Sequence, residues 1–516
     1  MLRRPALAAT ALAVVAALTL AGCSPARSSS QPLPSLSPKP ISTTGPSSPP
    51  PSPGLSAFYR QKVAWHRCRG ADLCTRIKVP LNYAHPHRRA ISLAVLKVPA
   101  QGGGRRVGDL VVNPGGPGGS GLDYAANAAS YFDPQVRQAF NIVGFDPRGV
   151  GHSTPLQCLT TKQADRFVAA DPDPDTPAEV RRADALTRAF GRGCLRDDAG
   201  LTRHMSTAEA AKDMDVLRAV LGEPKLVYFG ASYGTFLGAT YADLFPRRIG
   251  RMVLDGAINP DVSTVQMSLV QAHGFEVALR AYVGHCVAEG SCFLGSTVNA
   301  GIRHIQRFLA SVDAHSLPGE AGRRLTEGNA VLGIWAPLYN RSYWPYLDTA
   351  LKAGFAGNGS VLMSLSDAYT DRGPNGYRDN SLSALYAVNC LDHDDAITSS
   401  QVPKLIPRFE KASPTFGRDF AYGADACAYW PVHSGRVPAP VSAPGAPPIL
   451  VIGTTRDPAT PLVWARALAH QLNSAVLIKR NGDGHTGYHA GNSCVDNTVD
   501  SYLVSGAVPK THEVDC

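Results

Sequence analysis

The feature that most constrains the fold is a strand-turn-helix pattern around one serine. Residues 226–235 read Leu-Val-Tyr-Phe-Gly-Ala-Ser-Tyr-Gly-Thr, and a helix-like run continues to Phe245. In such a pattern the serine occupies a sharp, strained turn, and the flanking glycines avoid a clash between strand and helix. We therefore predict that Ser232 is a nucleophile projecting from a sheet. A chance Gly-x-Ser-x-Gly, in a chain with 49 glycines, would not require the strand before it and the helix after it.

Apolar runs bounded by glycine, proline or aspartate indicate buried parallel strands. Helical patterns separate several of them, such as Ala208–Leu221 and Leu462–Leu472. This alternation predicts an α/β fold with a doubly wound, mostly parallel sheet. The expected strands are Ile91–Val98, Gly108–Asn113, Phe140–Phe145, Leu226–Phe229, Arg251–Leu254, Ile449–Gly453 and Ala475–Lys479.

Strand signals nearly vanish between residues 259 and 440, where helix-like stretches with aromatic residues take over. We interpret 259–440 as an inserted helical cap and 55–258 and 441–516 as the two parts of the sheet domain. The chain has 516 residues, of which 44% are hydrophobic, enough for one large core or two smaller ones. The net charge of +9 is spread without a lysine/arginine run, so no nucleic-acid partner is expected.

A glycine-rich segment, Pro114–Gly121, follows the strand expected at Gly108–Asn113. Acyl transfer requires backbone N–H groups directed at the oxygen that becomes negative. In folds with this serine turn, one comes from the residue after the nucleophile and another from a loop of this kind. We expect Tyr233 and Gly116 to form this oxyanion hole, because Pro117 has no N–H.

The same segment permits a second interpretation. Gly116–Gly121 matches G-x-G-x-x-G and Asp146 ends a later strand, as in a dinucleotide-binding fold. That interpretation leaves the serine turn unexplained.

The catalytic acid and base should follow the serine along the chain, in loops just beyond strand ends. Asp457 and His485 occupy such positions. Neutral His485 can take the proton of Ser232, while Asp457 fixes the imidazole tautomer and stabilises the imidazolium. The alternatives are His489 for the base and Asp255 for the acid.

The first residues have the pattern of an export signal. Arg3 and Arg4 precede an apolar stretch shorter than the ~20 residues that span a membrane. The stretch ends in Leu-Ala-Gly-Cys at Cys23, which resembles a bacterial lipobox. We predict a signal peptide over 1–22, a lipid anchor on Cys23 and a flexible Ser/Pro-rich tether over 23–54. A plain signal peptide with a chance cysteine is the alternative.

Without Cys23, ten of the 11 cysteines remain, an even number that in an exported chain indicates disulfides. We expect neighbours in chain order to pair, and other pairings stay open. Neither C-x-x-C nor H-E-x-x-H occurs, so no metal and no cofactor are expected. The ten are Cys68, Cys74, Cys158, Cys194, Cys286, Cys292, Cys390, Cys427, Cys494 and Cys516.

Seven short motifs are spread over the chain: Asn113–Gly118, Gly144–Gly149, Gly230–Thr235, Leu254–Gly256, Cys390–Asp392, Cys427–Pro431 and Arg456–Pro461. Together they resemble the secreted tripeptidyl aminopeptidases, α/β-hydrolase serine exopeptidases related to proline iminopeptidases. The similarity spans roughly Trp65 to Cys516. It implies an α/β-hydrolase fold, a helical cap over the active site and a peptidase that trims short peptides from free N-termini. Family members include membrane-anchored lipoproteins, in agreement with Cys23. The stretch around His152 is closer to the proline iminopeptidases and leaves the length of the released peptide open.

An aminopeptidase must recognise a charged α-amine, and a desolvated ammonium group requires a carboxylate. Asp392, Asp394 and Asp395 lie beside Cys390, and of these we expect Asp392 to bind the amine. The alternative for Asp394 and Asp395 is a solvated acidic turn. His393 is not expected to complete a metal site, because four adjacent side chains do not converge on one ion.

These observations predict an exported serine exopeptidase that releases short peptides, with tripeptides expected, through an acyl-enzyme intermediate. A carboxylesterase or lipase would use the same triad, and a non-catalytic surface binding protein could share the scaffold. The expected partners are peptide substrates and, through the lipid anchor, the outer face of the cell membrane; the cell wall or the medium is the other expected location. The oligomeric state is not predicted.

Overall fold

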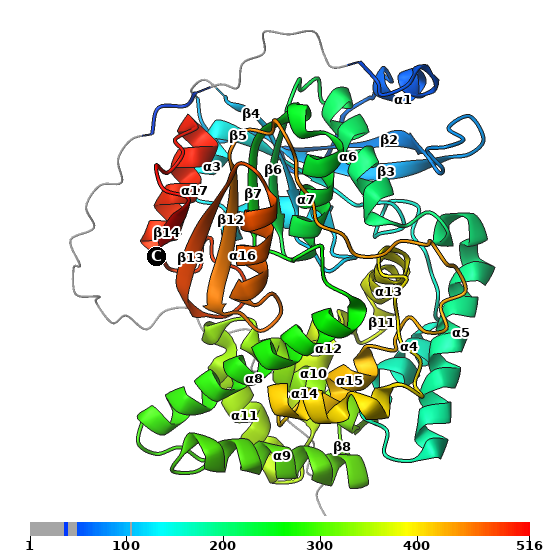
Figure 1. Cartoon of the computed structure of the whole chain (residues 1–516), viewed down its shortest axis with the longest axis vertical. Helices are drawn as coiled ribbons and strands as arrows, with labels where there is room; N and C mark the ends of the chain where they lie inside the picture. The colour runs from blue at the N-terminus through cyan, green and yellow to red at the C-terminus, as the bar shows by residue number, and fades with distance from the viewer. Residues whose placement is uncertain (1–35, 40–48, 104–105) are drawn as a thin grey trace, which may run out of the picture. The chain divides into compact units, whose positions relative to one another are not determined.

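The computed structural model describes residues 36–39, 49–103 and 106–516, and its elements are drawn in Figure 1. The predicted signal peptide, Cys23 and most of the tether lie outside these residues. Among the described residues, no helix combines the length and the apolar character that a membrane span requires.

A ten-stranded sheet has the order β1-β2-β3-β5-β4-β6-β7-β12-β13-β14. Neighbours from β5 to β14 are parallel, whereas β1, β2 and β3 form an antiparallel edge, in which β3 also runs antiparallel to β5. Strands β4, β5 and β6 are buried throughout, which explains their continuous apolar sequences. The bounds are β1 His66–Arg69, β2 Asp72–Pro80, β3 Ala90–Val98, β4 Gly108–Asn113, β5 Phe140–Phe145, β6 Leu226–Ala231, β7 Ile249–Asp255, β12 Ile449–Arg456, β13 Ala475–Asp483 and β14 Glu513–Asp515.

The fold is that of an α/β-hydrolase, and the seven expected strands correspond to β3–β7, β12 and β13. Strand β3 differs from the prediction because it is antiparallel to both neighbours. Strands β1, β2 and β14 were not predicted. The outer strand β2 alternates buried and exposed residues over much of its length, and β14 has three residues, so neither carries a continuous apolar run.

Several helices of the described chain pack on the sheet or on each other beside it (Figure 1). They are α2 Gly121–Ala126, α3 Pro134–Ala139, α6 Thr207–Val220, α7 Tyr233–Leu244, α16 Leu462–Gln471 and α17 Ser493–Ser505. A short helix, α1, spans Ser56–Tyr59.

Between β7 and β12 the chain forms a helical layer, drawn in the lower half of Figure 1. This layer has a hydrophobic core of its own, which includes Phe275, Leu351 and Phe409. Its helices are α8 Thr264–Ala288, α9 Val298–Ala314, α10 Glu327–Leu338, α11 Trp344–Phe355, α12 Ser360–Tyr369, α13 Ser381–Asp392, α14 Ile406–Ala412 and α15 Gly417–Gly423. Two short hairpins join them, β8 Leu317–Pro318 with β9 Arg324–Leu325 and β10 Arg372–Gly373 with β11 Gly376–Tyr377.

A second segment also contributes to this layer. Helices α4 (Thr161–Val168) and α5 (Pro177–Thr202) lie in the connection between β5 and α6. Arg372 donates to Asp165 of α4 at 2.6 Å, and Arg418 of α15 donates to Asp173, just before α5, at 3.0 Å. The predicted limits 259–440 therefore leave out part of the helical layer. The sequence pattern did not indicate this contribution, because α4 and α5 precede Ser232 and resemble an ordinary connection between two strands.

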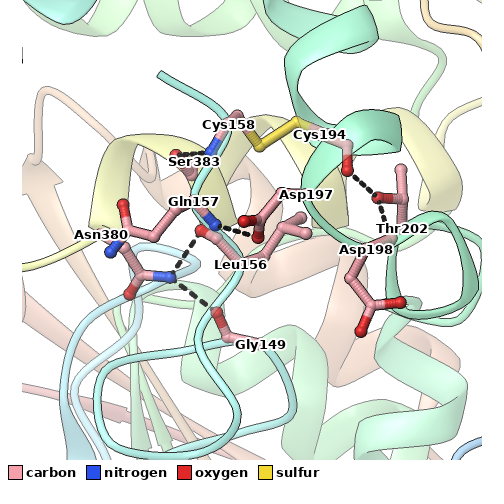
Figure 2. The surroundings of a disulfide bond; sticks show 10 residues. All are labelled: Gly149, Leu156, Gln157, Cys158, Cys194, Asp197, Asp198, Thr202, Asn380 and Ser383. Carbon is pink, nitrogen blue, oxygen red and sulfur yellow. Dashed lines mark hydrogen bonds between the residues drawn. A yellow bond between two sulfur atoms is a disulfide. The ribbon is translucent and has the colours of Figure 1, made fainter. Parts of the chain in front are cut away.

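Among the described residues, five disulfides join the ten cysteines as neighbours in chain order. One of them, Cys158–Cys194, ties the segment after β5 to α5 (Figure 2). Beside it, Asn380 donates from Nδ2 to the carbonyl groups of Gly149 and Leu156, at 2.8 and 2.9 Å. These bonds link the start of α13 to a loop of the sheet domain. The remaining pairs are Cys68–Cys74, Cys286–Cys292, Cys390–Cys427 and Cys494–Cys516.

Candidate active site

Ser232 lies at the turn between β6 and α7, with φ 56° and ψ −126°. A residue with a β-carbon is strained in this left-handed region, and such strain is frequent at functional sites. The Ser232 N–H donates to the carbonyl of Asp255, at the end of β7, at 2.8 Å. Its own carbonyl accepts the Thr235 hydroxyl at 2.6 Å. The strained turn that the Gly-x-Ser-x-Gly pattern predicts is present, held between two neighbouring strand ends.

Asp457 and His485 form a hydrogen-bonded pair. His485 Nδ1 lies 2.9 and 3.0 Å from the two carboxylate oxygens of Asp457. Asp457 is 1% exposed and also accepts the N–H groups of Ala459 and Thr460, at 2.9 and 2.8 Å. The Thr460 hydroxyl donates to the same carboxylate at 3.0 Å. A carboxylate fixed in this way holds the imidazole with its proton on Nδ1 and leaves Nε2 as the base.

The imidazole packs against the end of β7, next to the serine backbone. A β-carbon on Gly256, which follows Asp255, would lie 3.1 Å from His485 Cε1. Within the described residues, His485 Nε2 is buried without a hydrogen-bond partner, so no hydrogen bond joins it to Ser232. Catalytic hydrogen bonds are often long in a site without substrate and tighten when substrate binds. The arrangement is therefore compatible with proton transfer from Ser232 to Nε2.

The environment of His485 changes its basicity. Burial acts to lower the pKa of His485, but the charge of Asp457 and the hydrogen bond to it act in the opposite direction and prevail. The pKa of His485 therefore lies above its ordinary value. Since the imidazole must be neutral to accept a proton, the site should work only above the ordinary histidine pKa of about 6.5.

The glycine-rich loop lies directly against the nucleophile. A β-carbon on Gly115, whose φ is +100°, would be 2.8 Å from Ser232 Cβ and 3.0 Å from Tyr233 N, so only glycine permits this approach. The Gly115 N–H donates to the Asn113 side chain at 3.0 Å. The N–H groups of Gly116 and Tyr233 have no acceptor in the part of the chain that the structure describes. They are therefore free to donate to an oxyanion formed at Ser232.

Asp255, the alternative acid, accepts no hydrogen bond from His485 in the described structure. Its carboxylate accepts the backbone N–H groups of Gly487 at 2.8 Å and Tyr488 at 2.9 Å. Burial raises the pKa of Asp255 to about 6. Asp255 thus holds the loop that carries His485, a role that no sequence signal indicates beyond its place at a strand end.

The structure does not support the expectation that Asp392 binds a substrate amine, because its carboxylate is buried and already hydrogen-bonded. Its carboxylate accepts the Thr207 N–H at 3.0 Å and the Thr207 hydroxyl at 2.5 Å, and that hydroxyl lies 2.5 Å from the Tyr233 hydroxyl. Asp392 is thus part of a buried hydrogen-bond chain that joins α13, α6 and α7. Burial raises its pKa to about 6. Asp394 and Asp395 likewise accept hydrogen bonds from neighbouring residues.

One cavity borders His485, and a second lies beyond it in the helical layer. The first, which we call the histidine cavity, has a volume of about 1040 Å³. It is lined by His485, by other residues of the His485 loop, and by residues 339–342 of the helical layer. The second, the cap pocket, has a volume of about 380 Å³ and lies among α5, α10, α13 and α15. Tyr339 lines the first and Tyr369 the second, with their hydroxyl groups 3.1 Å apart. The Tyr339 carbonyl accepts the His485 N–H at 2.8 Å, so the cap pocket is two aromatic residues away from the base.

His489, the alternative base, also lines the histidine cavity. Its Nε2 lies 3.4 Å from Asp133 rather than against Asp457.

Comparison with known proteins gives several matches along the chain. A family described as TAP-like protein matches residues 413–516, which include Asp457 and His485. The serine protease Hip1 of Mycobacterium tuberculosis is 35% identical over 474 residues, 87% of this chain and 90% of that protein. Carboxylesterase B of Mycobacterium tuberculosis is 35% identical over 480 residues, 89% of this chain and 91% of that protein. The tripeptidyl aminopeptidase of Streptomyces coelicolor is 31% identical over 473 residues, 89% of this chain and 86% of that protein.

Proposed function

Because the chain belongs to the tripeptidyl aminopeptidase family of α/β-hydrolases and is a serine hydrolase, we propose that it is an exported exopeptidase that releases short peptides, chiefly tripeptides, from free N-termini. Ser232 is the nucleophile, His485 the general base and acid, and Asp457 the residue that orients the imidazole. One observation carries this proposal: the buried Asp457–His485 pair, at 2.9 Å, leaves Nε2 without a partner among the described residues. The imidazole packs on Gly256, and the carbonyl of the neighbouring Asp255 accepts the N–H of Ser232 in its strained turn.

The reaction follows from these positions. His485 Nε2 accepts the Ser232 proton as Oγ attacks the scissile carbonyl carbon. The N–H groups of Tyr233 and Gly116 stabilise the negative oxygen of the tetrahedral intermediate. His485 then donates its proton to the leaving nitrogen, and an ester to Ser232 remains. Water, deprotonated by His485, hydrolyses this acyl-enzyme and regenerates the free serine.

The cap pocket supports a preference for a free N-terminus. Aromatic side chains, including Trp335 and Tyr386, form much of its wall, and Asp171 and Asp419 lie among its lining residues. Asp419 is 9% exposed, and its Oδ2 has no hydrogen-bond partner among the described residues. Burial raises the pKa of Asp419 well above its ordinary value and that of Asp171 to about 6. An ammonium group beside these carboxylates would supply the positive charge that they lack.

Further carboxylates lie beside Asp171: one oxygen each of Asp171, Asp313 and Glu327 lies within 4.8 Å of the others. Burial and the charge of Asp173 raise the pKa of Glu327 to about 10. Arg418 pairs with Asp173 and Asp175, and within the described part of the chain Glu327 has no ion-pair partner. Such an excess of buried acidic groups favours a cationic ligand over the apolar acyl chain that a lipase would bind.

The disulfides of the chain support the proposal that it is exported. Five disulfides persist in an oxidising compartment and are rare in the cytosol. We propose that Cys23 carries the lipid that retains the enzyme at the outer face of the membrane, with the tether holding the catalytic domain away from it.

The test compares Ala-Ala-Ala-p-nitroanilide with its N-acetylated form and with a simple acyl ester. The free-amine anilide should be cleaved far faster than the acetylated one, and Ser232→Ala should lower its kcat by at least about 10³-fold. Asp419→Asn should reduce the ratio of the cleavage rates of the free and the acetylated anilide. The control Asp261→Asn, at an exposed position, should leave this ratio unchanged. Equal rates on free and acetylated anilides would contradict an aminopeptidase, and activity on the ester alone would identify a carboxylesterase.

A further inference from the structure

The histidine cavity carries more positive than negative charge. Arg341, Arg456 and Arg480 line it, together with Asp483 and Asp255. Asp483 is shared, because Arg456 Nε donates to one of its oxygens at 2.5 Å while Arg341 lies 3.6 Å from the other. Asp255 is occupied by the loop N–H groups described above. The surplus positive charge therefore has no partner of its own in the cavity.

Arg480 is the least compensated of these side chains. It donates to two backbone carbonyls, those of Asp483 at 3.0 Å and Ala490 at 3.1 Å. Its Nε is buried without a partner among the described residues. Burial lowers the pKa of Arg480, although the charges of Asp255, Asp483 and Asp496 act in the opposite direction. A guanidinium in this state is a strong donor for an incoming carboxylate.

The chemistry of the site indicates which part of a substrate enters this cavity. His485 must deliver its proton to the nitrogen of the departing fragment, so that fragment passes beside the imidazole. The loop that carries His485, residues 480–490, forms one wall of the cavity. The acidic cap pocket is suited to the opposite end of the peptide, its ammonium group.

We propose that the histidine cavity binds a carboxylate of the leaving fragment, through Arg480 and Arg341. This carboxylate is either the free C-terminus of a short peptide or an acidic side chain close to the cut. The inference rests on the proposed exopeptidase function and adds a substrate class to it: short or acidic peptides, with opposite charges bound at the two ends of the site.

The experiment compares kcat/KM for three tetrapeptides, the free acid Ala-Ala-Ala-Ala, its C-terminal amide, and Ala-Ala-Ala-Glu amide. The free acid should exceed the amide at least about 10-fold, because a charge-assisted hydrogen bond is lost in the amide. Ala-Ala-Ala-Glu amide separates the two carboxylate sources. Its kcat/KM exceeds that of the tetra-alanine amide only if the cavity also accepts an acidic side chain. Arg480→Gln should bring the acid-to-amide ratio close to 1.

Arg341→Gln provides a second variant on the opposite wall, where 59% of the side chain is exposed and folding is not at risk. It should also lower the ratio, whereas the matched control Arg303→Gln, an exposed residue of α9, should leave it unchanged. A ratio near 1 in the parent enzyme would overturn the inference, and hydrolysis of the tripeptide anilide, which lacks a carboxylate on its leaving group, would still support the exopeptidase.

If no peptide is cleaved, calorimetry on Ser232→Ala decides the question without turnover. The dipeptide Ala-Glu should bind more tightly than its diamide, and Arg480→Gln should remove the difference. Equal affinities for the two dipeptides would overturn the inference independently of catalysis.

Discussion

Replacing Asp392 with alanine tests the buried hydrogen-bond chain beneath the nucleophile. In the structure, the Asp392 carboxylate accepts hydrogen bonds from both the N–H and the hydroxyl of Thr207. The Thr207 hydroxyl also forms a hydrogen bond with the Tyr233 hydroxyl. In Asp392→Ala the hydroxyl can turn to Tyr233, but the N–H stays buried without an acceptor, at a cost of about 1–3 kcal/mol. The change also removes a buried charge whose pKa burial raises to about 6, which offsets part of this cost at pH 7. We expect a loss of about 1–3 kcal/mol in the free energy of unfolding.

Guanidinium denaturation followed by tryptophan fluorescence at pH 7 measures this loss. Asp392→Asn keeps one acceptor and buries no charge, so it should lose less, about 1 kcal/mol. The pH dependence gives a second reading. Burial raises the pKa of Asp392 to about 6 in the folded chain, above its value of about 3.9 in the unfolded chain. The folded state therefore binds the proton more tightly, and this group lowers stability as the pH rises from about 4 to 6. Asp392→Asn should lack that portion of the decline.

A free energy of unfolding of Asp392→Ala within about 0.5 kcal/mol of the parent value would refute the stabilising role of the buried hydrogen-bond chain. If Asp392→Ala also lost its preference for free over acetylated N-termini at unchanged stability, Asp392 would contact the substrate after all.

Three further predictions concern the acid, the loop and one disulfide. Asp457→Asn should lower kcat by about 10⁴-fold, because asparagine does not fix the imidazole tautomer. The acid limb of its pH–rate profile should move to lower pH, since the charge that raises the pKa of His485 is gone. An acid limb at unchanged pH would show that Asp457 does not cause the raised pKa of His485. Asp255→Asn should lower kcat/KM by roughly 10-fold through displacement of the His485 loop, with KM on the anilide little changed, and a change in KM alone would point to substrate binding. Replacing Cys158 and Cys194, 36 residues apart, with serine should lower the free energy of unfolding by about 3–4 kcal/mol on the loop-entropy estimate; equal denaturation midpoints would contradict this.

The parallel half of the sheet could be predicted from the sequence because its strands are buried on both faces. Continuous apolar runs mark β4, β5 and β6 with nearly correct bounds. The outer strands β1 and β2 could not be found in this way, because β1 is exposed and β2 has a solvent-facing side. The apolar run of β3 did not reveal its antiparallel direction. The contribution of α4 and α5 to the helical layer was missed, since nothing local in a helix records the distant segment that it contacts.

The residues at the strand ends were accessible to sequence reasoning, and those of the cap were not. Ser232, Asp457 and His485 each follow a parallel strand, and the carboxyl ends of such strands meet at one edge. Asp392 was chosen for its charge and its place beside Cys390, but position in the chain does not give the direction of a side chain. Asp171 and Asp419 come from segments far apart, and only the acidic residues at 171, 173 and 175 before α5 could have drawn attention to that pocket.

Reaction with a fluorophosphonate, followed by peptide mass spectrometry, tests the central claim most directly. This reagent phosphonylates a serine only when a neighbouring base activates it. We expect one adduct per chain, on Ser232, with a rate that falls as His485 becomes protonated and that is lost in His485→Ala. An adduct on another residue, or labelling of Ser232 that persists at full rate without His485, would contradict the proposed catalytic site.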